Sequence, residues 1–400
     1  MTGDENDNEK KVKMRRFGRI LATRGRASLR KRLAVMHSSI IEEHARLLCV
    51  CDFDHTISAY HLHDKGAREK GASGERSLSS HSIVENAGFL GTAFSEESER
   101  RFQKYYPLET NPRISIDERL KICDQWWGES HEAIIAAGFT KGMVARAVKA
   151  TEARLRIREG ATDFFSLFQS EDEEKSKRRE LIVFSAGLAD IIEEIVSLRV
   201  PLPSDHNAGC RPCSSNAQLR NKGFTGCLID CCGNRMIFEK AGEENAKVIA
   251  FGEIIHSCNK GEAVAKELRH LHAVEDGEGN AAAKVAAAAA AAGQDRQKRQ
   301  QPFVSLIVGD SVGDCAMGDA LEPLGGEDGC LRVGYLNHDD ADNERRAHYS
   351  TAGFDLLVLD DGPLDAVSAL IRGLSGDKRL LDEIVDEAEE LRGRGRQNER

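Results

Sequence analysis

Short apolar runs recur along the chain and are separated by longer segments in which apolar residues have helical spacing. The runs that we predict to be strands are, in chain order, residues 47–52, 181–184, 248–255, 303–308, 331–336 and 354–359. Apolar spacing from about residue 96 to residue 168 predicts helices. Strands that alternate with helices are typical of a parallel α/β sheet. We therefore predict an α/β fold with a Rossmann-like parallel sheet at its core.

The order of these segments predicts a core that is interrupted by a helical insertion. We assign the α/β core to residues 38–56 and 166–375 and a helical cap to residues 57–165. Two segments of biased composition, residues 203–226 and 276–301, are predicted to be loop insertions. The stretch from Lys10 to Arg32 is rich in Lys and Arg and has no acidic residue, so we expect residues 1–37 to be a disordered basic arm. After the last predicted strand we expect a polar helix, and residues 376–400 are assigned to a polar tail.

Composition narrows the range of partners. The net charge of -10 argues against nucleic acid as a partner, because the phosphate backbone selects basic surfaces. The sequence has no apolar stretch of the length that crosses a membrane, so we expect no membrane span. It also has no apolar secretory segment near its start, and we expect a cytoplasmic monomer whose eleven cysteines are reduced.

Two acidic residues follow the first predicted strand. Asp52 and Asp54 are two positions apart, and residues with that spacing in a strand share one face. Like charges held so close repel each other unless a cation or a proton separates them. The pair therefore suits Mg2+ and phosphate chemistry, in which one carboxylate attacks phosphorus and the other transfers a proton. The pattern also occurs by chance in loops and helix caps.

Polar clusters follow two further predicted strands. The second strand ends at Ser185, Ala186 and Gly187, and the strand at 303–308 leads into Asp310 and Asp314. The carboxyl ends of parallel strands lie at one edge of the sheet, where such folds bind their ligands. We therefore expect these side chains to meet the acidic pair.

This set of motifs resembles the haloacid-dehalogenase-like phosphohydrolases and, within them, the pyrimidine 5'-nucleotidase family. The similar segments are CDFDHTIS, YYPLETNPRISIDER, WWGESH, IVFSAGLADIIEE, CNKGEA, VGDSVGDCAMGDAL and VGYLN. The resemblance implies that Asp52 is a nucleophile that becomes phosphorylated and that Asp54 is the general acid and base. It also implies that Asp52, Asp310 and the backbone carbonyl of Asp54 bind Mg2+.

The same resemblance assigns the remaining site residues. It implies that Ser185, Ala186 and Lys260 hold the phosphoryl group and that Asp314 orients Lys260. Glu109 and Ser130 match positions that contact the nucleoside. The implied substrates are nucleoside 5'-monophosphates, either pyrimidine nucleotides such as CMP and UMP or 7-methyl-GMP.

Three alternatives remain open from the sequence. A phosphoserine phosphatase-like hydrolase would share the acidic motifs. A non-catalytic protein could use the basic arm on an anionic surface. Separately, four cysteines have a spacing that is compatible with a zinc site but that could also be incidental. They are Cys210, Cys213, Cys227 and Cys231.

Overall fold

The computed structural model describes residues 17–111, 113–168, 179–199, 229–240, 242–275, 303–338 and 343–397. Its centre is a seven-stranded sheet with the order β1-β9-β8-β7-β2-β3-β4. The strands are β1 (Arg19–Ala22), β2 (Arg46–Cys51), β3 (Arg179–Leu188), β4 (Ile229–Asn234), β7 (Phe303–Gly309), β8 (Cys330–Leu336) and β9 (Leu356–Leu359). Neighbouring strands are parallel, except that β1 runs antiparallel to β9 at one edge. The predicted α/β fold class is confirmed.

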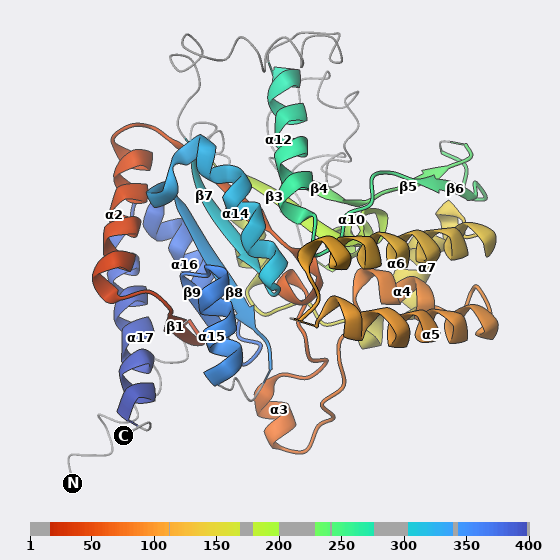
Figure 1. Ribbon diagram of the computed structural model, residues 1–400, viewed down its shortest axis with the longest axis horizontal. Coiled ribbons are helices and arrows are strands. Elements are labelled where there is room, and N and C mark those ends of the chain that lie inside the picture. Colours follow the sequence, from red (N-terminus) through yellow and green to blue (C-terminus); the bar gives the residue numbers. More distant parts are fainter. Residues whose placement is uncertain are drawn as a thin grey trace.

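Helices cover both faces of this sheet (Figure 1). On one face lie α2 (Arg26–Ile41), α10 (Ala189–Arg199), α16 (Asp365–Leu374) and α17 (Lys378–Gln397), and on the other lie α12 (Lys260–Glu275) and α14 (Val312–Gly325). Strand β2 contributes to both cores, because successive side chains of a strand point to opposite faces. Cys49 packs into the first core, whereas Leu48 and Val50 pack into the second. Burial on both faces explains the continuous apolar run in β2.

The strand order reverses at the centre of the sheet. The chain moves from β2 through β3 to β4 toward one edge, and later from β7 through β8 to β9 toward the other. Strands β2 and β7 are therefore neighbours although they are far apart in the sequence. In open parallel sheets, ligands bind beyond the carboxyl ends of the strands at such a reversal. The residues that follow β2 and β7 are the ones placed there.

A layer of helices lies beside this edge of the sheet (Figure 1). It contains α4 (Ser80–Asn86), α5 (Thr92–Glu109), α6 (Ile116–Ala136) and α7 (Lys141–Ala150). The hairpin of β5 (Met236–Phe238) and β6 (Val248–Phe251) packs against α6. The strand predicted at 248–255 therefore belongs to this hairpin and not to the main sheet. The shorter helices are α3 (Lys65–Glu69), α8 (Ala161–Ser166) and, near β9, α15 (Asn343–Ala352).

The prediction that residues 1–37 form a disordered arm is wrong for residues 17–37. Strand β1 completes the sheet, and α2 packs against it through buried Leu29, Leu33 and Met36. The abundant basic residues conceal this pattern, because most of them lie on the exposed side of α2. Arg32 is the exception, since it is buried and donates a hydrogen bond of 2.5 Å to the carbonyl of Cys330.

The predicted polar tail at 376–400 is a helix over most of its length, as expected, but one face of this helix is apolar and buried. Residues Lys378–Gln397 form α17, which packs against β1, α2 and α16. Leu381, Ile384, Val385 and Ala388 are buried on one face, whereas charged side chains fill the other. Helical spacing of apolar residues, rather than their number, is what secures this helix to the core.

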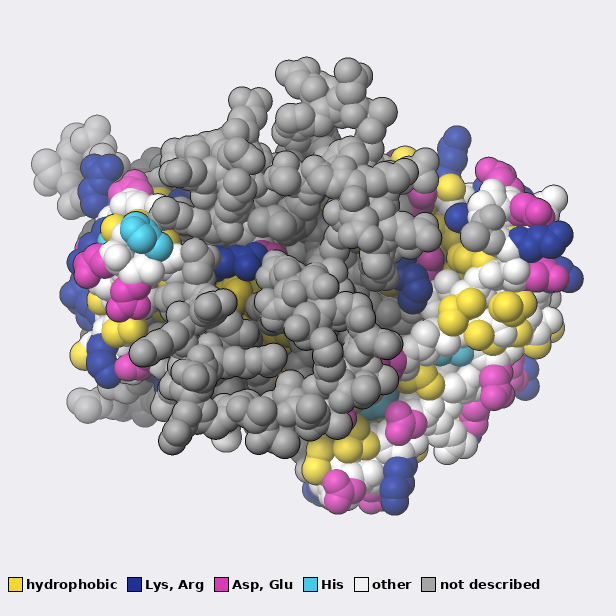
Figure 2. Space-filling view, turned by 90° about the horizontal axis from the view of Figure 1, so that it is seen from above, with side chains coloured by type: hydrophobic (Ala, Val, Ile, Leu, Met, Phe, Trp, Pro, Cys, Tyr) yellow, Lys and Arg dark blue, Asp and Glu magenta, His cyan; other side chains and the backbone are white. Residues whose placement is uncertain are grey.

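Some of the predicted features lie in parts of the chain that the structure does not describe. The insertions at 203–226 and 276–301 lie outside the described residues, as do Cys210, Cys213 and Cys227. Among the helices of the described segments, none has the length and apolar character needed to cross a membrane. On the face shown in Figure 2, basic and acidic side chains are interspersed over the described part of the surface.

Candidate active site

Asp52 and Asp54 lie on the turn that follows β2. The Asp52 backbone N–H donates a hydrogen bond of 2.9 Å to the carbonyl of Val308, which fixes the end of β2 to β7. The chain then makes a tight helical turn, Phe53–Ile57, in which His55 adopts a left-handed φ of 64°. A residue other than glycine seldom adopts this conformation, so the surrounding contacts must hold it. The two carboxylates are therefore positioned by a constrained turn.

Lys260 connects two of the predicted acidic residues. Its Nζ lies 2.9 Å from Asp52 Oδ1 and 2.5 Å from Asp314 Oδ1, and all three side chains are buried. Burial alone would lower the pKa of Lys260, but Asp314 and Asp52 more than offset it and raise the pKa. Burial raises the pKa of Asp52 to about 7, and Lys260 counteracts this rise. The structure thus holds an ammonium group beside the Asp52 carboxylate.

Asp52, Asp310 and Asp314 each place a carboxylate oxygen within 4.8 Å of the others. Burial, followed by repulsion from Asp52 and Asp314, raises the pKa of Asp310 well above its usual range. A divalent cation would relieve this repulsion, and hard ions such as Mg2+ prefer carboxylate oxygens. The donor set therefore fits a divalent cation.

Asp314 already has donors on both carboxylate oxygens. Lys260 donates to Oδ1, while the backbone N–H and the hydroxyl of Ser311 each donate 2.8 Å hydrogen bonds to Oδ2. This arrangement suits a residue that orients Lys260 better than one that binds a metal directly. It leaves Asp52 and Asp310 as the carboxylates best placed to bind a cation.

The Asp54 side chain turns toward Ser80 at the start of α4. Ser80 donates to it twice, from the backbone N–H at 2.7 Å and from the hydroxyl at 2.6 Å. The same hydroxyl accepts a 3.1 Å hydrogen bond from the N–H of Leu188, just after the Ser-Ala-Gly motif of β3. Burial raises the pKa of Asp54, and the two hydrogen bonds from Ser80 oppose that rise. Ser80 thus fixes the position of the Asp54 carboxylate.

Gly187 is required by this contact. An added Cβ at Gly187 would lie 1.9 Å from Ser80 Oγ and 2.5 Å from Asp54 Oδ2. We expect Gly187→Ala to displace Asp54 and to lower kcat about a hundredfold, since misplacing a reacting group by about 1 Å can cost that much. The measurement is steady-state release of phosphate, the activity that the sequence motifs predict, at saturating substrate. Gly128→Ala is the matched control, because a Cβ there meets no heavy atom within 4 Å. Equal kcat values for the two variants would contradict this role of Gly187.

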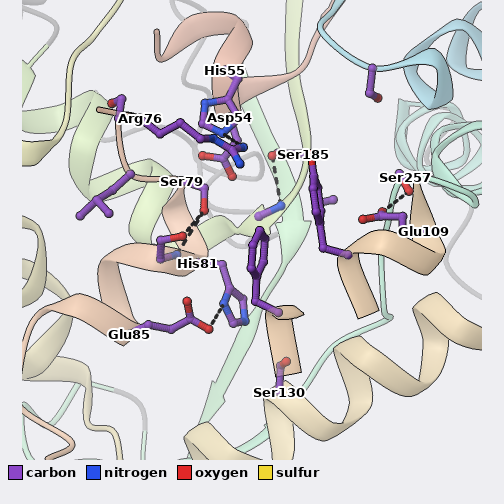
Figure 3. A pocket seen from close by; sticks show the side chains of 18 of the residues that line it. Asp54, His55, Arg76, Ser79, His81, Glu85, Glu109, Ser130, Ser185 and Ser257 are labelled. Carbon is purple, nitrogen blue, oxygen red and sulfur yellow. Dashed lines mark hydrogen bonds and ion pairs between the residues drawn. The ribbon is translucent and has the colours of Figure 1, made fainter. Parts of the chain in front are cut away.

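A cavity of about 500 Å3 opens beside these groups, between the sheet edge and the helical layer. The site residues predicted from the sequence that line it are Asp52, Asp54, Glu109, Ser130, Ser185, Ala186, Lys260 and Asp310. Asp314 does not line the cavity and acts through Lys260. Figure 3 shows Glu109 on one side of the cavity and Asp54 with His81 on the other. The helical layer and the sheet edge therefore face a common space.

The helical layer supplies an aromatic wall to this cavity. The wall consists of Phe102, Tyr106, Trp126 and Trp127. Phe102 and Tyr106 stack with ring centroids 4.8 Å apart, and the two tryptophan rings stack at 6.1 Å. These side chains are incompletely buried, which leaves ring surface open to the cavity. Aromatic faces of this kind can stack on a flat ligand.

Glu109 is held at the wall of the cavity by a neighbour from the core. The Ser257 hydroxyl donates a short hydrogen bond to its Oε1. Burial raises the pKa of Glu109, and the hydrogen bond from Ser257 opposes that rise. The carboxylate therefore has a fixed position on the cavity wall, from which it can accept hydrogen bonds.

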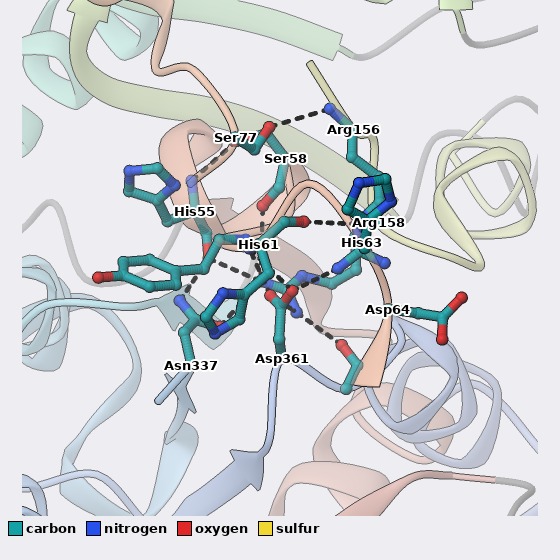
Figure 4. A network of polar contacts seen from close by, with 12 residues as sticks. His55, Ser58, His61, His63, Asp64, Ser77, Arg156, Arg158, Asn337 and Asp361 are labelled. Atoms are coloured by element: carbon teal, nitrogen blue, oxygen red, sulfur yellow. Dashed lines mark hydrogen bonds and ion pairs between the residues drawn. The ribbon is translucent and has the colours of Figure 1, made fainter. Parts of the chain in front are cut away.

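The sequence reasoning missed Ser80 and Arg158. Ser80 is the first residue of α4 and follows a segment rich in Ser and Gly, and no sequence pattern distinguishes it from its neighbours. Arg158 is buried and binds the turn that carries Asp54 (Figure 4). Arg158 lies three residues before the apolar run of α8, and no sequence motif there marks it as part of a catalytic site.

The fold and the site define a haloacid-dehalogenase-like protein with a helical cap, in which acidic groups meet at the switch point of a parallel sheet. The family described as "Pyrimidine 5'-nucleotidase (UMPH-1)" matches residues 67–202 and 212–375. The chain belongs to the pyrimidine 5'-nucleotidase family, as the sequence motifs predicted, and it is a 5'-nucleotidase.

Similarity to individual proteins agrees with this assignment to the family. The chain is 27% identical over 329 residues to the 7-methylguanosine phosphate-specific 5'-nucleotidase of Mus musculus, covering 82% of this chain and 84% of that protein. It is 25% identical over 328 residues to the Homo sapiens protein of the same name, with the same two coverages. A crystal structure of cytosolic 5'-nucleotidase IIIB bound to cytidine has the same fold, with a TM-score of 0.57 and 18% identity, covering 94% of this chain and 96% of that one.

Proposed function

We propose that the chain is a Mg2+-dependent 5'-nucleotidase that cleaves nucleoside 5'-monophosphates through a phosphorylated Asp52. The single observation that carries the proposal is the convergence of Asp52, Lys260 and Asp310 at the ends of β2 and β7 and the start of α12. These residues come from distant parts of the chain, and together they surround one end of the cavity. Such a group of charges suits a phosphoryl group.

The proposed reaction has two displacement steps at phosphorus. In the first, an Asp52 carboxylate oxygen forms a bond to phosphorus, the bond from phosphorus to the 5' oxygen breaks, and Asp54 gives its proton to that oxygen. In the second, water attacks phosphorus while Asp54 takes its proton, and the bond from Asp52 to phosphorus breaks. The raised pKa of Asp54 suits a group that must carry a proton in the first step.

The remaining polar groups would bind the phosphoryl oxygens. Lys260 and Ser185 line the cavity beside Asp52 and offer an ammonium group and a hydroxyl. Asp52 and Asp310, with the backbone carbonyl of Asp54, would bind Mg2+. Bound there, the ion would neutralise negative charge on the phosphoryl oxygens and reduce the repulsion between the carboxylates.

The opposite wall of the cavity would bind the base. The aromatic wall offers ring faces for stacking, and Glu109 offers a hydrogen-bond acceptor. Cytosine and 7-methylguanine both carry an exocyclic amino group that can donate to a carboxylate, whereas uracil carries a carbonyl oxygen at the corresponding position. We therefore propose CMP and 7-methyl-GMP as better substrates than UMP.

A substrate panel with one variant tests this proposal. We expect phosphate release from CMP and 7-methyl-GMP to require Mg2+, and we expect Glu109→Gln to lower kcat/KM for both about tenfold or more. A simple aryl phosphate has no nucleoside, so its hydrolysis by Glu109→Gln should stay close to that of the unaltered protein. Glu118→Gln, at an exposed position of α6 outside the cavity lining, is the matched control.

Other outcomes would count against the proposal. Phosphoserine hydrolysed faster than every nucleotide would favour the phosphoserine phosphatase alternative. Activity that persists after chelation of divalent cations would remove the role of Mg2+. Equal loss of aryl phosphate and CMP hydrolysis in Glu109→Gln would show that Glu109 does not act through the nucleoside.

A further inference from the structure

A second group of potential metal ligands lies behind Glu109, outside the cavity lining. It consists of Cys123 on α6 and His256 and Cys258 on the segment that leads into α12, and their ligand atoms lie within 4.8 Å of one another. Cys123 and His256 are fully buried, and Cys258 is partly buried. The proposed nucleotidase reaction uses none of these three side chains.

The spacing of the two sulfur atoms fits a tetrahedral metal. Cys123 Sγ and Cys258 Sγ are 3.8 Å apart. Two thiolates that each lie about 2.3 Å from a tetrahedral zinc ion are about 3.8 Å apart. The two sulfur atoms can therefore ligate one tetrahedral metal ion without moving apart.

The histidine is held in the tautomer that a metal requires. The backbone N–H of Cys258 donates a 3.2 Å hydrogen bond to His256 Nδ1, so this nitrogen carries the lone pair, and a bound metal ion would replace that hydrogen bond. His256 Nε2 lies 3.0 Å from Asp124 Oδ1, to which it can donate. Histidine ligands of zinc commonly donate their second ring N–H to a carboxylate in this way. A disulfide between the cysteines would need neither the histidine nor this carboxylate.

We propose that Cys123, His256 and Cys258 form a zinc site that links helix α6 to the segment preceding Lys260. The fourth position can be taken by water or by Glu109, whose Oε1 lies 3.9 Å from Cys123 Sγ. Two thiolates would balance the charge of the ion, and the burial of the site would exclude competing hard ligands. The site differs from the carboxylate cluster in the metal that it prefers, because sulfur and nitrogen ligands favour zinc whereas carboxylate oxygens favour magnesium.

The experiment uses the full chain purified without an affinity tag that binds metals. After chelation, the protein is titrated with Co2+ and then with Zn2+. We expect a sulfur-to-cobalt charge-transfer absorption that Zn2+ abolishes, because this band reports thiolate ligands and not the carboxylate cluster. The double variant Cys123→Ser and Cys258→Ser should lose the band. The control double variant Cys210→Ser and Cys213→Ser should retain it.

A second test changes an exposed residue instead of a buried one. Asp124 is exposed, so Asp124→Asn should fold normally while weakening zinc affinity about 10- to 100-fold through His256. Asp117→Asn, also exposed on α6, should leave zinc affinity unchanged. Absence of a thiolate band in the unaltered protein would overturn the proposal. A band that survives loss of Cys123 and Cys258, or zinc affinity that is equal in the two aspartate variants, would also overturn it.

Discussion

Replacing Asp52 by asparagine is expected to reduce kcat/KM for nucleoside monophosphates by at least about a thousandfold. The amide has nearly the shape of the carboxylate, but it is a poor nucleophile toward phosphorus. It also removes one charge from the cluster that includes Asp310 and from the ion pair with Lys260. The measurement is phosphate release from CMP and 7-methyl-GMP with saturating Mg2+.

Two observations separate loss of chemistry from loss of structure. Asp117→Asn makes the same chemical change at an exposed position outside the cavity lining and should retain full activity. Rapid acid quenching of the unaltered protein during turnover should trap phosphate on a peptide that contains Asp52. An Asp52→Asn variant that keeps more than about a tenth of the activity would rule out the proposed covalent step.

The sequence is most informative where local pattern and chemistry coincide. Asp52, Ser185 and Asp310 each follow an apolar run that predicts a buried parallel strand, and such strands share one carboxyl edge. Their meeting around one cavity could therefore be predicted without coordinates. Lys260 and Glu109 required the resemblance to a family, because neither follows a strand.

The remaining parts depend on tertiary contacts that leave no local signal. Ser80 matters only because Asp54 lies opposite it, and its partner is 26 residues away in the sequence. By composition, α2 resembles a solvated basic segment. Its apolar stripe stabilises the fold only by packing against β8 and α17, which the local sequence does not reveal. Composition therefore gave the wrong structure for residues 17–37 and, in α17, concealed the apolar face that packs on the core.

Arg158 illustrates the same limit inside the site. Its guanidinium donates to the carbonyls of His55 and Thr56 at 2.7 and 2.6 Å, and these residues belong to the turn between β2 and the helical layer. It also lies 3.0 Å from the buried carboxylate of Asp361 (Figure 4). The centre of its guanidinium is 4.1 Å from the ring centre of Tyr335. Arg158 thus shares the His55 carbonyl with Asn337, which donates to it at 2.9 Å, and the two side chains together hold the turn that carries Asp54.

We expect Arg158→Met to lower the free energy of unfolding by about 3 kcal/mol, because it leaves the buried Asp361 charge short of a partner, removes the guanidinium donor of the Thr56 carbonyl and leaves the His55 carbonyl with Asn337 as its remaining side-chain donor. Urea unfolding followed by tryptophan fluorescence measures this change. Arg379→Met is the matched control, since its side chain is 88% exposed and its ion pair with Asp377 should contribute less than about 1 kcal/mol. Equal urea midpoints for the two variants would contradict the role of Arg158.

A double variant separates the charge from the hydrogen bonds. Asp361 keeps an ion pair with Arg156 and accepts hydrogen bonds of 2.8 and 3.1 Å from the N–H groups of Tyr60 and His61, so part of its charge remains compensated in Arg158→Met. If the unpaired charge dominates, adding Asp361→Asn to Arg158→Met should recover about 1 kcal/mol or more. If the turn carbonyls dominate, the double variant should stay as unstable as Arg158→Met. Activity should stay low in both, because neither variant restores the donors that hold the turn carrying Asp54.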